Sequence, residues 1–319
     1  MMRVGAIDCG TNSIRLLIAD VDDGRLTDVV RMMRVVRLGQ GVDATGRLAA
    51  ESLERTFAAA EEYGALLEEH GVGRLRFAAT SATRDAENRQ DFVDGIVARL
   101  GVEPEVITGD EEAALSFAGA ASVLEAGRAE PVLVIDLGGG STEFVLGAGG
   151  GVTAAASVDV GCVRLTERHL HDDPPTSEQI GAAVADVDAV IDEVAKTVPL
   201  DSAATVVGVA GSVTTVTAHA LGLDSYDRNA IHAAELDIDR IAGVASGLLN
   251  MPRSERADLP YMHPGRVDVI GSGALIWERI LRRLQAMTDG QVRTAIASEH
   301  DILDGIALSA ADATSNGAA

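Results

Sequence analysis

The chain has 319 residues, of which 47% are hydrophobic and 24% are charged, and its formal net charge is −23. This length predicts two domains, and the composition is that of a globular protein rather than a disordered one. The negative charge argues against binding of duplex nucleic acid, and no apolar run is long enough to predict a membrane-spanning helix. Two distant cysteines, Cys9 and Cys162, in a chain without an export signal predict free thiols in a reducing cytoplasm.

The first predicted elements are two strands joined by a polar turn. The stretch AIDCGTNSIRLLIAD covers 6–20 and places Asp8 near the end of the first strand. The turn itself consists of Gly10, Thr11, Asn12 and Ser13. Backbone N–H groups and short polar side chains of this kind can form a pocket for a polyanion. A tight hairpin with a solvated aspartate explains the same stretch equally well.

Alternating strand and helix patterns continue through the first half. The elements predicted next are a strand at 28–38, a helix at 51–71, a strand at 74–80, a helix at 85–99, a short strand at 105–107 and a helix at 111–125. The helix at 51–71 is indicated by apolar residues at helical spacing, including Leu53, Phe57 and Ala60.

The opening pattern occurs a second time. AIDCGTNSIRLLI (6–18) aligns without gaps on VIDLGGGSTEFVL (134–146). Asp8 then matches Asp136, Gly10 matches Gly138, Ser13 matches Ser141, and Arg15 falls opposite Glu143. A repeat at the spacing of one domain predicts two related domains.

The second half is predicted to follow the same order of elements. It contains strands at 131–136, 143–147 and 152–159, a helix at 177–198 with Ser177 as its N-cap, and a strand at 204–210. GAGGG (147–151) is predicted to be a hairpin turn. A third glycine turn, GVAGSVTTV (208–216), contains Gly211 and Ser212 and opens a helix. Such a turn favours an anion or a nucleotide, although a plain strand-to-helix turn is the alternative. Two β-β-β-α-β-α halves that face each other would form a cleft between domains.

These segments resemble those of a known family. DCGTNSIRLL, IDLGGGSTE and GVAGS look like the two phosphate motifs and the nucleoside-side motif of the sugar kinase, actin and Hsp70 superfamily. The finer pattern resembles the exopolyphosphatase and guanosine pentaphosphate phosphohydrolase (Ppx/GppA) family. Its further matches are ATSATRDAENR (79–89), ITGDEEAALSF (107–117), DVGCVRLTE (159–167) and RADLPYMHPGRVDVIGSGALI (256–276). The segment ASEHDILDGIAL departs from the family, with His300 and Asp301 near its usual arginine.

The resemblance implies an α/β fold of two RNase H-like (actin-like ATPase) domains that face an interdomain cleft, in a short two-domain form. We expect an N-terminal domain at 1–122, joined by the C-terminal helix at 301–312, and a second domain at 123–300. Residues 313–319 are expected to form a disordered tail.

The resemblance also assigns roles in the cleft. Glu112 matches the catalytic position and would act as a general base toward water. Asp136 and Glu143, with Asp8 facing them, would hold Mg²⁺ or Mn²⁺, although either aspartate could simply cap its turn. The predicted phosphate-binding residues are Gly10, Thr11, Asn12, Ser13, Arg15, Arg84, Gly138, Gly139, Gly140, Ser141, Thr142, Cys162, Arg164, Gly211, Ser212 and Arg266. Each arginine could instead form a surface ion pair, and Cys162 could instead be a small packing residue.

The expected activity is release of the terminal phosphate from inorganic polyphosphate, from guanosine pentaphosphate, or from both. The partners are then these polyphosphorylated ligands, with no duplex nucleic acid and no membrane, in a cytoplasmic homodimer. An ATP-using kinase or a nucleotide-gated binding module of the same superfamily is the alternative.

Overall fold

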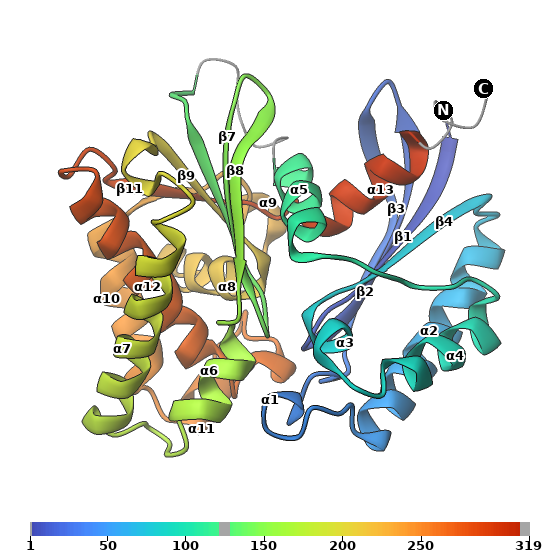
Figure 1. Cartoon of the computed structure of the whole chain (residues 1–319), viewed down its shortest axis with the longest axis horizontal. Coiled ribbons are helices and arrows are strands. Elements are labelled where there is room, and N and C mark those ends of the chain that lie inside the picture. The colour runs from blue at the N-terminus through green and yellow to red at the C-terminus, as the bar shows by residue number, and fades with distance from the viewer. Residues whose placement is uncertain (1, 121–127, 313–319) are drawn as a thin grey trace. The chain divides into compact units, whose positions relative to one another are not determined.

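The structure is a computed structural model that describes residues 2–120 and 128–312. It divides into two compact units (Figure 1). Unit 1 comprises Met1–Gly119 together with the segment from Ile302 onward, and unit 2 comprises Ala120–Asp301. The expected boundary at 122/123 and the expected tail at 313–319 lie outside the described residues. Within the described residues, no helix has the length and apolar character needed to cross a membrane.

Unit 1 contains a five-stranded mixed sheet in the order β3-β2-β1-β4-β5. Its strands are β1 (Met2–Cys9), β2 (Ser13–Asp22), β3 (Arg25–Val35), β4 (Arg74–Ala79) and β5 (Glu105–Val106). β1, β2 and β3 are antiparallel neighbours, whereas β4 pairs with β1 in parallel. The carboxyl ends of β1 and β4 therefore meet at one edge of the sheet.

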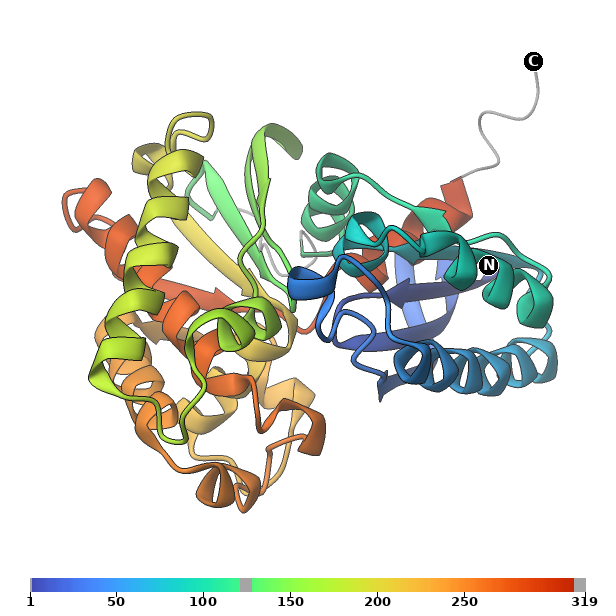
Figure 2. The same cartoon turned by 60° about the horizontal axis from the view of Figure 1, so that its bottom comes forward.

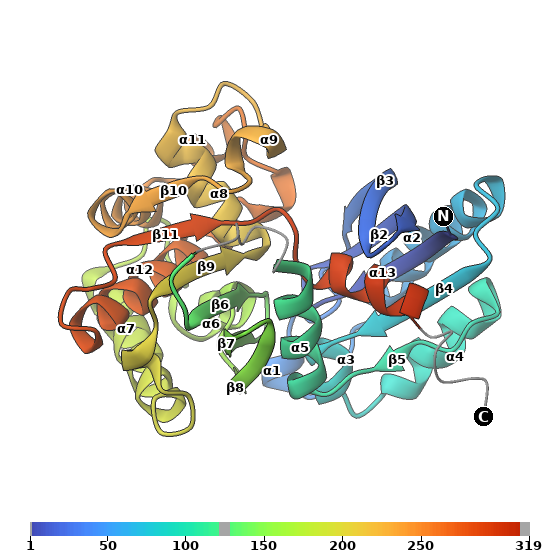
Figure 3. The ribbon, with the colours of Figure 1, turned by 90° about the horizontal axis from the view of Figure 1, so that it is seen from above.

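Helices cover both faces of this sheet because its strands are apolar on both sides. Ile7, Ile14 and Leu16 pack with α2 (Ala50–Glu69) and α4 (Arg89–Leu100), which lie side by side in Figure 2. Ala6 and Leu17 face the other way and pack with α13 (Ile302–Asp312), which runs along the strands in Figure 3. Unit 1 also contains α1 (Val42–Thr45), α3 (Ser81–Asp85) and α5 (Gly109–Ala120).

Unit 2 contains a six-stranded sheet in the order β10-β11-β9-β6-β7-β8. Its strands are β6 (Val132–Leu137), β7 (Thr142–Ala148), β8 (Gly151–Val158), β9 (Thr205–Val209), β10 (Glu235–Asp237) and β11 (Thr294–Ala297). β6, β7 and β8 are antiparallel, and β9 pairs with β6 in parallel. Apart from the added β10, this is the strand order of unit 1, which is the structural counterpart of the sequence repeat.

The helices of unit 2 pack a large apolar core against its sheet. They are α6 (Cys162–His169), α7 (Ser177–Val194), α8 (Ala210–Leu221), α9 (Arg228–Ile231), α10 (Ile238–Asn250), α11 (Arg253–Ala257) and α12 (Ile270–Met287), with short 3₁₀ turns η2 (Leu200–Ser202) and η3 (Pro264–Arg266).

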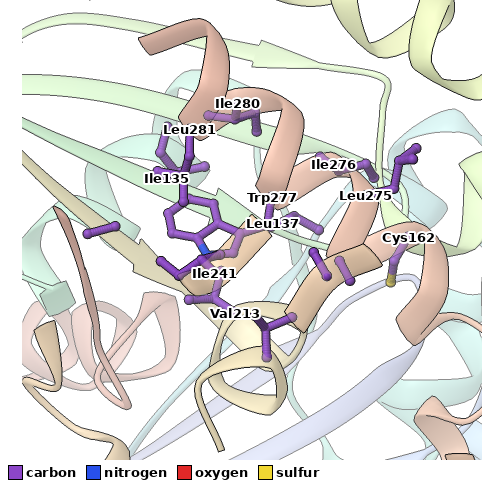
Figure 4. Close-up of a cluster of buried hydrophobic side chains, with 14 of the residues drawn as sticks. Ile135, Leu137, Cys162, Val213, Ile241, Leu275, Ile276, Trp277, Ile280 and Leu281 are labelled. Atoms are coloured by element: carbon purple, nitrogen blue, oxygen red, sulfur yellow. The ribbon is translucent and has the colours of Figure 1, made fainter. Parts of the chain in front are cut away.

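Trp277 on α12 lies in the centre of this core and is 1% exposed (Figure 4). A Cβ atom on Gly208 would lie 2.6 Å from the Trp277 ring. Because protein interiors are close-packed, Gly208 is needed for the indole to fit beneath the end of β9.

Most predicted strands are confirmed to within a few residues, and the hairpin in GAGGG forms with positive φ at Gly149 and Gly150. The helix predicted at 85–99 is confirmed as α4 (Arg89–Leu100), but its predicted start is four residues too early, since Asp85 ends α3. The N-cap of α7 is Thr176 and not Ser177. Thr176 forms a reciprocal capping box with Gln179, which satisfies two backbone donors at once. The helix predicted at 111–125 corresponds to α5 as far as Ala120, and residues 121–125 lie outside the described residues.

Candidate active site

The first polar turn joins β1 to β2 and is closed by a backbone hydrogen bond. Gly10 N donates to Ser13 O at 3.0 Å. Asp8 and Arg15 are directly opposite each other across the two strands. Arg15 Nη2 and Nε donate to one oxygen of Asp8, at 2.6 and 2.8 Å. The structure therefore places one predicted phosphate ligand against one predicted metal ligand, and the negative charge of the buried Asp8 is offset within its own turn.

The segment after β3 holds the carbonyl groups of this turn. Thr11 O accepts from Gly39 N at 2.8 Å, and Asn12 O accepts from Val36 N at 3.1 Å and Arg37 N at 2.9 Å. A Cβ atom on Gly39 would collide with the Thr11 side chain, so this approach requires glycine. The turn is thus fixed by backbone donors from a neighbouring loop.

Two residues that lie beside the first turn were not among the site residues predicted from the sequence. Thr80 follows β4, and its N–H donates to Cys9 O at 3.1 Å. Ser81 begins α3, and its hydroxyl lies 2.9 Å from that of Thr11. The signal that could have found them is their position, since Thr80 and Ser81 join β4 to α3 as Ala210 and Gly211 join β9 to α8, and both strands run parallel to the strand before a glycine turn.

Glu112 lies in the first turn of α5 and is 7% exposed. Arg84 Nη1 donates both to Glu112 Oε2 at 3.1 Å and to Ile107 O at 3.0 Å. The neighbouring Glu111 is exposed and pairs with Arg76 at 2.5 Å. The two adjacent glutamates therefore have different environments, and only Glu112 is buried and held by Arg84.

The second glycine turn joins β6 to β7 and repeats the first turn's geometry. Gly138 N donates to Ser141 O at 3.0 Å, the same bond at the same length as in the first turn. Asp136 and Glu143 are directly opposite each other, in the register positions of Asp8 and Arg15. Asp136 is 6% exposed and Glu143 is 1% exposed, and Glu143 Oε1 accepts from Ser157 at 2.8 Å. Two buried carboxylates thus meet where the first turn has an ion pair.

Helix α6 lies against this second turn. Cys162 N donates to Gly138 O at 3.0 Å, and Val163 N donates to Gly139 O at 2.8 Å. Gly161 approaches so closely that its Cβ atom would lie 2.5 Å from the Gly139 carbonyl. Arg164, predicted to bind phosphate, donates from Nε to Gly140 O at 2.8 Å. The sequence did not single out Gly161, whose requirement is visible only when the two segments meet.

The third glycine turn leads from β9 into α8. Ala210 begins this helix with a φ of 70°, a strained value for a residue with a side chain. A Cβ atom on Gly211 would lie 2.5 Å from the Arg266 guanidinium, so this arginine covers the glycine closely. Burial raises the pKa of the Cys162 thiol, while a hydrogen bond with Ser212 and the charge of Arg266 lower it by less. Cys162 is therefore a protonated packing residue rather than a thiolate.

Asp136 and Glu143 suit a magnesium or manganese ion better than a zinc ion. Both supply carboxylate oxygens, which Mg²⁺ prefers, and Mg²⁺ commonly keeps only one or two protein carboxylates plus substrate and water oxygens. No cluster of three or more His, Cys, Asp or Glu side chains with metal-binding geometry occurs among residues 2–120 and 128–312. The donor set therefore fits a divalent cation that is shared with a phosphate ligand.

In the same unit, the His300 ring lies tilted against the His232 ring with ring centroids 4.5 Å apart, and Asp301 is buried.

The repeated strand order and the paired glycine turns define an actin-like α/β protein. The model of the Ppx/GppA phosphatase family matches residues 17–310, and the chain belongs to that family. The family and the α/β fold expected from the sequence are thus confirmed.

Named relatives extend over nearly the whole chain. Exopolyphosphatase 2 of Mycobacterium tuberculosis is 50% identical to it over 320 residues, which cover 98% of this chain and 99% of the relative. The crystal structure of an exopolyphosphatase-like protein matches with a TM-score of 0.95 at 49% identity, covering 98% of this chain and 100% of the other. An exopolyphosphatase from Cytophaga hutchinsonii matches with a TM-score of 0.83 at 26% identity, over 95% and 96% of the two chains.

Proposed function

We propose that this chain is an exopolyphosphatase, which uses water to remove the terminal phosphoryl group of inorganic polyphosphate. The observation that carries the proposal is the 50% sequence identity, over 98% of the chain, to a protein named exopolyphosphatase 2. The buried Glu112 and the two matching turns supply groups suited to this chemistry.

Glu112 is the proposed general base. Its carboxylate takes a proton from the attacking water while the water oxygen bonds to the terminal phosphorus. The bond from that phosphorus to the bridging oxygen breaks, which releases orthophosphate and a polyphosphate that is one unit shorter. Arg84 keeps the Glu112 carboxylate in one orientation, because it also binds the carbonyl of Ile107.

The two glycine turns are proposed to bind the phosphate chain and to stabilise charge on the transferring group. Phosphoryl transfer depends mainly on positioning and on neutralising charge, so fixed donors are suited to it. The proposed ligands in the first turn are Gly10, Thr11, Asn12 and Ser13 with Arg15 beside them, and those in the second are Gly138, Gly139, Gly140, Ser141 and Thr142. Gly211, Ser212 and Arg266 extend the proposed site at α8.

Asp136 and Glu143 are proposed to hold Mg²⁺ or Mn²⁺, whereas Asp8, the third metal ligand expected from the sequence, is paired with Arg15. When bound, the ion would neutralise charge on the phosphate oxygens. The two carboxylates would also repel each other less with a cation between them.

Guanosine pentaphosphate is a second proposed substrate, because its terminal phosphate is released by the same reaction. We further propose a cytoplasmic homodimer: Cys9 and Cys162 are buried free thiols, which suits a reducing compartment, and the family resemblance supports the dimer.

Phosphate release from short polyphosphate, long polyphosphate, guanosine pentaphosphate and ATP tests the proposal, with and without Mg²⁺. We expect Mg²⁺-dependent release from polyphosphate, and we expect Glu112→Gln to lack it. Glu111→Gln is the matched control, since it makes the same change one residue away on the exposed side of α5. Turnover of ATP alone, with transfer to an acceptor, would instead support a kinase.

A further inference from the structure

Segment 160–164 follows β8 and supplies a row of hydrogen-bond donors to the second glycine turn. The first N–H groups of a helix have no partner within the helix. In α6, Cys162 N donates to Gly138 O at 3.0 Å, and Val163 N and Arg164 N donate to Gly139 O at 2.8 and 3.2 Å. The carbonyls of the turn therefore satisfy the free end of α6.

The side chain of Arg164 extends this row by one residue. Its Nε donates to Gly140 O at 2.8 Å, and the side chain is only 12% exposed. Three successive carbonyls of the turn, those of Gly138, Gly139 and Gly140, thus accept hydrogen bonds from one short segment.

This arrangement fixes the direction of the N–H groups of the turn. In a planar trans peptide, the C=O of one residue and the N–H of the next point in opposite directions. Since three carbonyls point toward α6, the N–H groups of Gly139, Gly140 and Ser141 point away from it. Successive N–H groups that face one way form a concave site for an anion.

In unit 1, backbone N–H groups from a neighbouring segment bind the carbonyls of the first turn in the same way. There the segment after β3 donates to Thr11 O and Asn12 O through the backbone N–H groups of Val36, Arg37 and Gly39. A glycine permits the close approach in both units, Gly39 in the first and Gly161 in the second. The arrangement is therefore built twice, and in unit 2 the donor to the third carbonyl is an arginine side chain.

We propose that Arg164 is a positioning residue, which holds the Gly140 carbonyl so that the Ser141 N–H faces the substrate phosphate, rather than a residue that binds phosphate itself. The inference rests on the proposed polyphosphatase function. It differs from the sequence-based expectation, in which the guanidinium charge of Arg164 grips the phosphate chain.

Hydrogen bonding and charge can be separated with two substitutions of similar length. Arg164→Gln keeps a neutral N–H donor, whereas Arg164→Met has none. Because loss of one fixed donor to a developing oxyanion costs about 10²–10³-fold, we expect Arg164→Met to lower kcat by at least about 10-fold. We expect Arg164→Gln to retain more kcat than Arg164→Met, and the KM for polyphosphate to stay within about twofold of wild type in both.

Arg168→Met is the matched control, since it removes the same charge from the same helix at a residue that contacts Asp186 and the Asp159 carbonyl. Arg164 Nη2 also lies 3.8 Å from Asp159 Oδ1, and because Arg164→Gln and Arg164→Met both lose this contact, the difference between them reports the bond to Gly140. A rise in KM that is equal for Arg164→Gln and Arg164→Met, or an unchanged kcat for Arg164→Met, would overturn the proposal.

A second measurement separates failure of this inference from failure of the proposed function. We expect the ¹⁵N amide signals of Gly140 and Ser141 to shift in Arg164→Met and to stay in place in Arg168→Met, whether or not the protein hydrolyses polyphosphate. Unshifted signals in a folded Arg164→Met protein would refute the positioning role. Wild-type protein that releases no phosphate from polyphosphate would refute the function alone.

Discussion

The two glycine turns share a backbone and differ in charge. Each turn closes with the same hydrogen bond of 3.0 Å, from Gly10 to Ser13 in unit 1 and from Gly138 to Ser141 in unit 2. Each follows a strand whose last residue but one is a buried aspartate, Asp8 or Asp136. Across the strand pair, however, Asp8 meets an arginine and Asp136 meets a glutamate.

This difference shows how one repeated turn can acquire two roles. The Asp8–Arg15 pair is neutral overall, so the first turn can offer neutral donors and a guanidinium to an anion. The Asp136–Glu143 pair instead places two carboxylates at neighbouring positions, and carboxylate oxygens are the ligands that a divalent cation such as Mg²⁺ prefers. We therefore propose that the residue opposite the aspartate, Arg15 or Glu143, decides whether a phosphate-binding turn also holds a metal ion.

Neither turn supplies the base in the proposed mechanism, and Glu112→Gln tests this with the largest expected effect. The amide cannot accept the proton of water, so we expect kcat to fall by about 10³-fold with substrate binding nearly unchanged. Steady-state phosphate release measures this, with Glu111→Gln as the control. A near-normal kcat would remove Glu112 from the proposed mechanism.

Asn12→Ala sharpens the assignment of the first turn to phosphate. The substitution removes an amide but leaves the closing hydrogen bond between Gly10 and Ser13. We expect kcat to fall by about 10²-fold, the typical cost of losing one fixed donor, with little change in melting temperature. Asn250→Ala is the control, since the exposed Asn250 side chain donates its amide to the Ser246 carbonyl of its own helix. Full activity in a stable Asn12→Ala protein would contradict a phosphate-binding role of the Asn12 side chain, and the first turn would be an ordinary hairpin turn.

Gly208→Ala tests the packing of the Trp277 ring against β9 in the core of unit 2. The added methyl group would enter the space of the Trp277 ring, so we expect a loss of about 1–3 kcal/mol in the free energy of unfolding. Gly181→Ala on α7 is the control, because its Cβ atom meets open space and alanine is the better helix former. Chemical denaturation measures both variants, and equal stability for the two would contradict the packing argument.

The thiols beside the two turns should differ slightly in reactivity. Burial and then the Asp8 carboxylate raise the pKa of Cys9 well above its ordinary value. The pKa of Cys162 is also raised by burial, but its hydrogen bond with Ser212 and the charge of Arg266 oppose the shift. Since the thiolate is the reactive form, we expect both native thiols to react slowly with a thiol reagent, and Cys162 to react before Cys9. Cys9→Ser and Cys162→Ser identify each phase, and the reverse order would contradict this comparison.

The sequence was sufficient to predict the framework of both turns. The gap-free repeat predicted that Asp8 and Asp136 occupy equivalent positions, and the register confirms that Arg15 and Glu143 stand opposite them. The apolar patterns also predicted most strands, because side-chain alternation and helical spacing are local properties.

Contacts between distant segments could not be predicted in this way. Three arginines share one chemistry in the sequence, but in the structure Arg15 binds Asp8, Arg84 binds Glu112, and Arg164 binds the Gly140 carbonyl. These partners depend on how loops approach one another. The same holds for the two positions that require glycine, Gly161 against Gly139 and Gly208 against the Trp277 ring. A sequence pattern identifies which groups are available, whereas packing decides what each group touches.

The Mg²⁺ dependence of phosphate release in two matched variants tests the division of roles most directly. Glu143→Gln removes one charge from the second turn, and Arg15→Gln removes one from the first. For Glu143→Gln we expect the Mg²⁺ concentration for half-activity to rise by about 10–100-fold, with little change in the KM for polyphosphate. For Arg15→Gln we expect the reverse, a higher KM with an unchanged Mg²⁺ requirement. If both variants shift the Mg²⁺ requirement equally, or if neither does, Arg15 and Glu143 do not give the two phosphate-binding turns different roles toward the metal.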